Sequence, residues 1–97
     1  MSEWVSESVL ITHAVGLHAR PAVKFTKLAK NFSAAIEISA TADGPWIDGK
    51  SIVKVMAMKA RGNTTLHMRA KGADAADALA SLSSLVTRDF DETEHAG

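Results

Sequence analysis

The chain has 97 residues and no cysteine, and its 11 basic and 11 acidic side chains cancel to a formal net charge of +0. This length predicts one domain with one hydrophobic core, and the missing thiols exclude disulfide frameworks, thiol catalysis and thiolate metal sites. The balanced charge argues against capture by nucleic acid or by an anionic membrane through an overall electrostatic field.

The first residues carry no recognisable targeting signal. Met1–Ser8 contains Glu3 and Glu7 and lacks the basic segment and apolar core of a signal peptide. No apolar run in the sequence is long enough to cross a bilayer. We therefore expect a cytoplasmic protein without membrane insertion.

The first half of the chain changes from a strand pattern to a helix pattern. Alternating apolar residues predict a half-buried strand over Val5–Ile11, and Gly16 is suited to an unusual backbone angle shortly afterwards. From Ala19, apolar residues recur at helical spacing as far as Phe32, and Pro21 suits a first helical turn. The basic residues on one side of this helix are Arg20, Lys24 and Lys27.

The remainder of the chain, after Phe32, predicts three more strands and two more helices. Strands are expected at Ile36–Ile38, Trp46–Ile47 and Leu66–Ala70. Ser51 suits the N-cap of a short helix, and Asp74 can cap a last helix. This order of elements, with polar outer strand positions, predicts an α+β fold in which a four-stranded antiparallel sheet has one wet face and three helices on the other. We expect residues 1–90 to form the domain and residues 91–97 to form a flexible acidic tail.

The most informative segment is Gly16-Leu17-His18-Ala19-Arg20-Pro21-Ala22, which places a histidine just before a helix begins. Unpaired backbone N–H groups and the positive end of the helix dipole favour an anion at this position. Neutral imidazole is a competent nucleophile near pH 7, and the Arg20 guanidinium has donors matched to phosphoryl oxygens. A lone histidine before a helix is more often a cap or a surface residue, but the glycine, arginine and proline around His18 favour a phosphoryl acceptor.

This segment resembles the active-site motif of the HPr phosphocarriers of the bacterial phosphoenolpyruvate:sugar phosphotransferase system. The stretch Lys50–Met56, a serine opening a short apolar helix, is similar to the second motif of that family. The resemblance covers roughly Val5–Arg88 and implies an open-faced β-sandwich that acts as a stoichiometric carrier. It implies no cofactor and no turnover of a small molecule, and we expect a monomer.

The resemblance also implies a role for particular residues. His18 would accept a phosphoryl group from enzyme I, at the ring nitrogen nearer the backbone, and would transfer it to a IIA-type domain for sugar uptake or regulation. Arg20 would hold the phosphoryl oxygens during an in-line transfer between two histidines, supported by Ala19, Lys24 and Lys27. The apolar patch on which both partners dock would consist of Ile52, Val53 and Met56.

Ser51 has two interpretations. A helix N-cap explains it fully, and the resemblance adds phosphorylation by a dedicated HPr kinase, which would place negative charge in the docking patch and weaken partner binding. One departure from the family is visible, because the segment before Lys50 is longer than usual, with Ala42–Trp46 as the apparent insertion. How this insertion shapes the hairpin between the second and third predicted strands, and whether it affects the choice of partner, stay open questions.

A competing motif lies in Gly44–Ser51, which matches the P-loop pattern G-x-x-x-x-G-K-[ST] and would imply nucleotide binding. A P-loop needs a buried parallel strand before it and a full helix after it. Here the preceding strand alternates and the following helix meets Gly62 within a few turns. We therefore do not expect nucleotide binding.

Metal and nucleic-acid binding have weak signals. His13 and His18 share a loop without carboxylates or thiols, and His67 and His95 look exposed, so we expect no metal site. The aromatic residues are scattered and offer no stacking platform for nucleic acid. An interaction module with an inert histidine remains open, and acquisition of acid-labile, base-stable phosphate would distinguish it from a phosphocarrier.

Overall fold

The computed structural model describes residues 3–12 and 16–91. The elements follow one another as β1 (Val5–Ile11), α1 (Ala19–Ala29), β2 (Ala35–Ser39), β3 (Ile47–Asp48), α2 (Ile52–Met58), β4 (Thr64–Lys71) and α3 (Ala75–Thr87), and a 3₁₀ turn, Asp89–Asp91, follows α3. No helix in these two ranges is long and apolar enough to cross a bilayer.

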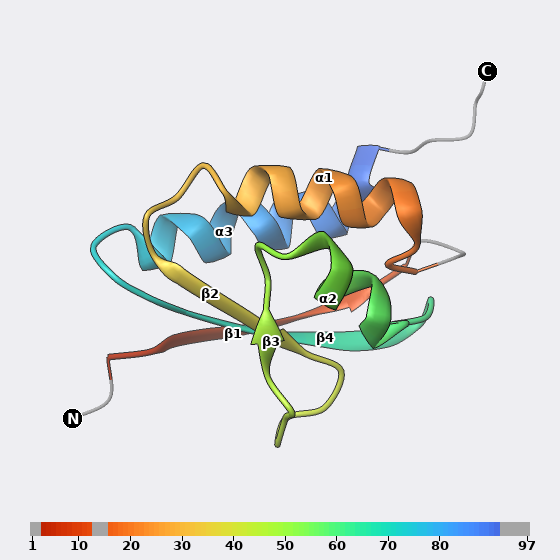
Figure 1. The fold of residues 1–97 in the computed structure, drawn as a ribbon, viewed down its shortest axis with the longest axis horizontal. Helices are drawn as coiled ribbons and strands as arrows, with labels where there is room; N and C mark the ends of the chain where they lie inside the picture. The colour runs from red at the N-terminus through yellow and green to blue at the C-terminus, as the bar shows by residue number, and fades with distance from the viewer. Residues whose placement is uncertain (1–2, 13–15, 92–97) are drawn as a thin grey trace.

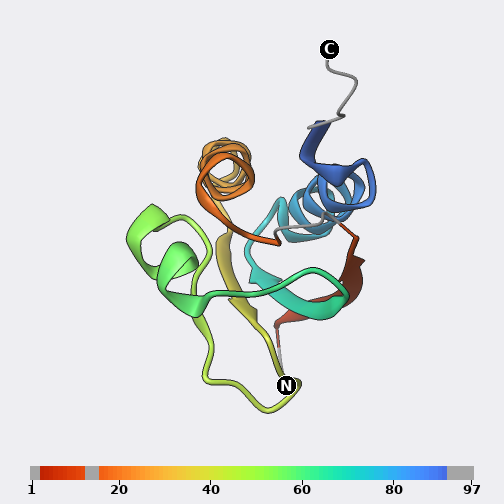
Figure 2. The ribbon, with the colours of Figure 1, turned by 90° about the vertical axis from the view of Figure 1, so that its right-hand side faces the viewer.

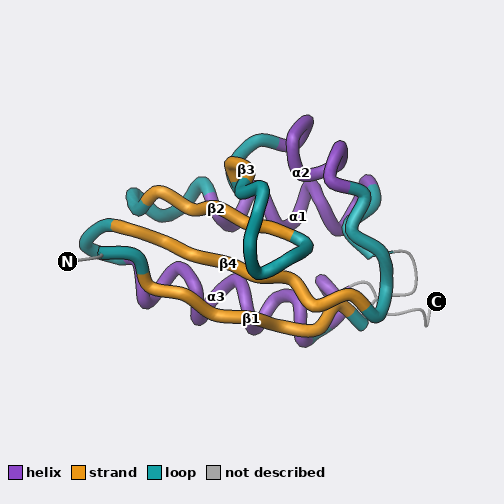
Figure 3. Tube along the Cα trace, turned by 90° about the horizontal axis from the view of Figure 1, so that it is seen from below, coloured by secondary structure: helices purple, strands orange, loops and turns teal. Residues whose placement is uncertain are grey.

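The strands form one four-stranded sheet in the order β1-β4-β2-β3, and each neighbouring pair is antiparallel. Figure 3 shows this order from below, with α1 and α3 behind the sheet and α2 beyond its β3 edge. The register places Val9 opposite Leu66 and Ile38 opposite Met68, so the apolar side chains of adjacent strands share one face. The predicted α+β architecture, an open-faced sandwich with an antiparallel sheet and three helices, is confirmed.

The core lies between the sheet and the helices α1 and α3, which cover the same face of it (Figures 1 and 2). Phe25 of α1 and Leu82 of α3 are fully buried, as are Ile38 and Met68 on the sheet. The shorter helix α2 packs against α1 and β3 at the sheet's edge, and its Val55 reaches the core. This arrangement leaves most of the surface of α2 available to solvent.

Two predicted boundaries differ from the structure. Helix α1 ends at Ala29 rather than near Phe32, because the amides of Asn31 and Phe32 bond to carbonyls three residues back, which tightens and ends the last turn. Phe32 still packs against the core, which explains why the apolar pattern continues past the helix. The third strand is Ile47–Asp48, one residue later than predicted.

Asp74 occupies the N-cap position of α3, as predicted, but its carboxylate does not cap that helix. It accepts hydrogen bonds instead from the backbone N–H groups of Ser33, at 2.9 Å, and Ala34, at 2.8 Å. The bond from Ser33 is the main reason that the pKa of Asp74 is lowered from its usual value of 3.8. Asp74 thus ties the start of α3 to the connection between α1 and β2.

The last described residues return to the core. Phe90 is fully buried in the 3₁₀ turn, and Asp89, Phe90 and Asp91 all have positive φ. Asp91, which the sequence assigns to the tail, therefore lies in this turn, and residues 92–97 of the predicted tail fall outside the described ranges.

Candidate functional site

The loop before α1 has a shape that only glycine at position 16 allows. Gly16 has a φ of +69°, and a Cβ atom at this position would lie 2.2 Å from the carbonyl oxygen of Ala60. The N–H of Leu17 donates to that same carbonyl at 2.9 Å, and the N–H of His18 donates to Gly16 at 2.9 Å. The loop that carries His18 is therefore fastened to the segment between α2 and β4.

His18 is the N-cap residue of α1 and has extended backbone angles, φ −91° and ψ −162°. Its carbonyl accepts the first helical hydrogen bond, from Ala22 at 2.9 Å, while its side chain makes no capping bond and is exposed. The predicted position of His18 just before a helix is confirmed, and the ring is available to solvent.

The opening turn of α1 suits an anion. Its N–H groups, that of Ala19 among them, have no acceptor within the helix, and the turn contains no acidic residue. Pro21 is buried in this turn, where its missing N–H costs no hydrogen bond. The helix dipole and these amides would therefore stabilise negative charge carried beside His18.

A pocket of about 400 Å³ opens beside His18. The residues that line this His18 pocket are Leu17, His18, Met56, Lys59, Ala60 and Arg61. Lys59 and Arg61 were not among the predicted site residues, because only the long-range contact between Gly16 and the α2–β4 segment brings them to the histidine. Their basic character in the sequence was visible, but no local spacing linked them to His18.

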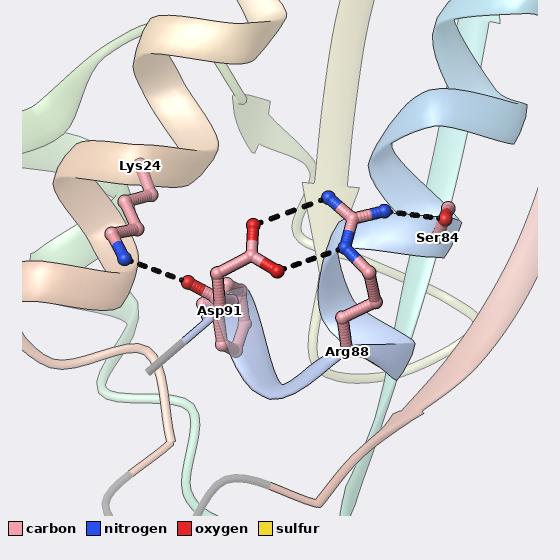
Figure 4. A network of polar contacts seen from close by, with 5 residues as sticks. Lys24, Ser84, Arg88 and Asp91 are labelled. Carbon is pink, nitrogen blue, oxygen red and sulfur yellow. Dashed lines mark hydrogen bonds and ion pairs between the residues drawn. The ribbon is translucent and has the colours of Figure 1, made fainter. Parts of the chain in front are cut away.

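Lys24 and Lys27, predicted to support the phosphoryl group, line a different hollow together with Arg88 and Asp91. The Lys24 ammonium donates to the carbonyl of Phe90 at 3.0 Å, as Figure 4 shows. In the same network the Arg88 guanidinium donates to Asp91 at 2.9 Å, and this hydrogen bond is the main cause that lowers the pKa of Asp91. Contact of either lysine with a phosphoryl group on His18 stays a prediction.

Arg20 is exposed in the opening turn of α1, two residues after His18, and it is not among the residues lining the His18 pocket. Its predicted role in holding phosphoryl oxygens stays a prediction.

The predicted docking patch lies on α2, next to the His18 pocket. Val53 is 73% exposed and Met56, which also lines the pocket, is 38% exposed, whereas Ile52 is half-buried and packs against the core. Val23 on α1 is exposed as well and was not included in the sequence prediction. Exposed aliphatic and thioether groups beside a polar site are typical of a surface that accepts other proteins.

Ser51 is the N-cap of α2, as predicted. Its backbone is extended, and its Oγ accepts a hydrogen bond from the N–H of Lys54 at 3.3 Å. Phosphorylation of Ser51 stays a prediction.

The P-loop-like segment has no nucleotide-binding architecture. The strand within it, β3, has two residues and pairs antiparallel to β2. The ammonium of Lys50, which would have to face a nucleotide phosphate, donates instead to the carbonyl of Phe32 at 2.7 Å. These observations agree with the expectation that the motif match is accidental.

The apparent insertion Ala42–Trp46 is held over the open face of the sheet. The Arg69 guanidinium lies between two indoles, 4.3 Å from the ring centre of Trp46 and 4.4 Å from that of Trp4. It also donates to Glu37 at 2.8 and 2.6 Å. The loop and α2 enclose a second pocket of about 710 Å³, the Trp46 pocket, whose lining includes Lys54 and Met58.

Within residues 3–12 and 16–91, no group of three or more His, Asp or Glu side chains could hold a metal ion. His67 shares a hydrogen bond of 3.0 Å with Ser8 on the open face of the sheet. His13 and His95 lie outside the described ranges.

The fold and the site thus define the class of this protein, a small open-faced α+β sandwich whose first helix begins at an exposed histidine. A family model described as "PTS HPr component phosphorylation site" matches residues 5–88. The chain belongs to this family, the HPr phosphocarrier proteins of the phosphotransferase system.

Individual relatives are similar to this chain in sequence and in structure. The phosphocarrier protein HPr of Pseudomonas putida is 35% identical over 89 residues, which cover 92% of this chain and 98% of the relative. That of Mycoplasma capricolum is 43% identical over 72 residues, covering 74% and 79% of the two chains. The crystal structure of HPr-C-His from Thermoanaerobacter tengcongensis superposes with a TM-score of 0.84 at 29% identity, covering 92% and 98%.

Proposed function

We propose that His18 is the phosphoryl-carrying residue of this phosphocarrier, that enzyme I is its donor and that a IIA-type domain is its acceptor. The observation that carries the proposal is the exposed His18 ring at the N-cap of α1, where it makes no capping bond. An imidazole engaged in capping or packed in the core could not reach a donor.

The transfer is a displacement at phosphorus between two imidazoles. The unprotonated nitrogen of His18 that lies nearer the backbone supplies the electron pair for the new P–N bond. The P–N bond to the donor histidine breaks, and its electron pair stays with the donor imidazole. The amides of the opening turn, with Arg20 beside them, stabilise the charge on the phosphoryl oxygens, so positioning and electrostatics supply most of the rate.

The protein acts stoichiometrically in this proposal, as a cytoplasmic monomer that turns over no small molecule and needs no cofactor. Each cycle ends when the acceptor domain takes the phosphoryl group and leaves the His18 imidazole free. Sugar uptake and regulation are the two uses that such an acceptor would serve.

Val53 and Met56, with Ile52 beneath them, form the docking patch in this proposal. Their exposure next to the His18 pocket supports it, since a partner seated on α2 would bring its own histidine to the site. A phosphate on Ser51, added by an HPr kinase, would place about two negative charges at the start of this helix and weaken docking.

The test is phosphorylation by enzyme I with phosphoenolpyruvate, followed by intact mass measurement. We expect a gain of one acid-labile phosphoryl group that His18→Ala abolishes and Ser51→Ala preserves. A wild-type protein that gains no mass, or a His18→Ala variant that still gains it, would overturn the proposal.

A further inference from the structure

The lining of the His18 pocket includes two basic residues that come from the segment after α2 and not from the opening turn of α1. Lys59 and Arg61 are both exposed and both line the pocket with the histidine. None of the described residues that line it is acidic. Two basic residues therefore belong to the lining of the pocket, and no carboxylate stands among the described lining residues.

The backbone at Lys59 is unusual for a lysine. It forms the C-cap of α2 in the left-handed conformation, with φ 52° and ψ 41°. Glycine or asparagine is the ordinary residue there, and longer side chains are disfavoured in this conformation. A lysine at this position adds a basic residue to the pocket lining, where glycine would add none.

The segment that carries these cations is fixed relative to His18. The carbonyl of Ala60, between the two residues, accepts the hydrogen bond from Leu17. The backbone of Arg61 lies against Gly16, since a Cβ added to that glycine would be 2.7 Å from the Cα of Arg61. The cations and the imidazole thus belong to two loops that are joined backbone to backbone.

We propose that Lys59 and Arg61 bind the phosphoryl oxygens when His18 is phosphorylated, an inference that rests on the proposed function of His18. Guanidinium and ammonium groups form charge-assisted hydrogen bonds to phosphoryl oxygens. The amides of α1 and the cations of the α2–β4 segment then face the phosphoryl group from two different elements. Each cation favours the dianion of the phosphoryl group over its monoanion.

The test is a ³¹P NMR titration of the phosphoprotein, loaded with phosphoramidate, a small phosphoryl donor that needs no partner protein. Lys59→Asn keeps a residue that tolerates left-handed angles, and Arg61→Gln keeps the length of the side chain. We expect each substitution to raise the pKa of the phosphoryl group by about 0.2 to 0.7, with a larger rise in the double variant. Lys59→Arg should restore the wild-type value, and 1 M salt should reduce the differences.

The matched control is Lys54→Gln, which removes the same charge from α2 but at the Trp46 pocket. If the Lys59 and Arg61 variants shift the phosphoryl pKa no more than this control does, the inference is overturned. If phosphoramidate loads His18 and enzyme I does not, the proposed donor is wrong while the titration still decides the role of the two cations. If neither reagent loads His18, both proposals fail.

Discussion

Gly16 sets the position of His18 because the loop turns sharply and passes directly over the α2–β4 segment. Its positive φ is easily adopted by glycine, and the missing side chain leaves room for the carbonyl of Ala60. The contact also brings Lys59 and Arg61 to the pocket. Gly16 therefore allows the close backbone contact that places the α2–β4 segment beside the loop of His18.

Gly16→Ala should destabilise the fold and displace the site. The left-handed φ alone costs about 1 kcal/mol, and a Cβ so close to a backbone carbonyl forces the two loops apart. We expect the free energy of unfolding in urea to fall by about 2 to 3 kcal/mol in total. Gly62→Ala serves as a comparison, because Gly62 is not among the glycines with positive φ. An equal loss in both variants would contradict the account of the loop.

The ionisation of Asp74 should make the free energy of unfolding depend on pH in the acid range. Its pKa is lowered in the folded state, chiefly by the hydrogen bond from Ser33, so its ionised form stabilises the fold. This contribution is fully present above the unfolded value of 3.8 and is lost as the pH falls through the lower folded value. We expect urea unfolding to show that Asp74→Asn is less stable than wild type at neutral pH and that the difference narrows below about pH 4. A difference that stays constant down to pH 2 would show that ionisation of Asp74 is not the cause.

Helix α2 carries the residues on which the predicted partner proteins would dock. Its seven residues present Val53 and Met56 to solvent, Ser51 caps its first turn, and its C-cap residue Lys59 lines the His18 pocket. A change of charge at Ser51 should therefore affect docking more than folding.

Ser51→Asp and Ser51→Asn separate these two effects, because both side chains can cap a helix and only one is charged. We expect both variants to unfold within about 0.5 kcal/mol of wild type, whereas Ser51→Ala should lose about 1 kcal/mol. In steady-state transfer from enzyme I, Ser51→Asp should raise KM severalfold and leave kcat unchanged. If Ser51→Asn raises KM as much, charge at this position is not what governs docking.

The elements of the fold were predictable because their apolar periods are regular, and His18 was predictable because its neighbours Gly16 and Pro21 have strong local preferences. The end of α1 was not, since Phe32 continues the apolar pattern while the backbone leaves the helix. The side-chain role of Asp74 was missed because its partners, Ser33 and Ala34, are 40 or more positions away in the chain.

At the scale of the whole molecule, the sheet has one face buried under α1 and α3 and one face on which polar residues meet the two indoles. Arg69 joins three parts of the chain there, since it contacts Trp4 before β1, Glu37 on β2 and Trp46 in the inserted loop. This cluster lies on the face of the sheet away from the helices, so it stabilises the fold without taking part in the His18 site.

Arg69→Gln should lower the free energy of unfolding by about 1 to 2 kcal/mol, because it removes stacking on two indoles and a partly exposed ion pair. Phosphorylation of His18 by enzyme I should proceed at the wild-type rate. Lys71→Gln is the control, since Lys71 stands farther from an indole, 5.7 Å from the centre of Trp4. Loss of phosphorylation in a folded Arg69→Gln protein would contradict this separation of stability from function.

The most direct test of the central claim locates the phosphoryl group on the folded protein. Ring-nitrogen NMR spectra of the ¹⁵N-labelled protein, recorded before and after phosphorylation by enzyme I, distinguish the four histidines and the two nitrogens of each. We predict that the ring of His18 alone acquires a P–N bond, at the nitrogen nearer the backbone. A phosphoryl group found on His13, His67 or His95, with the His18 ring unmodified, would contradict the account.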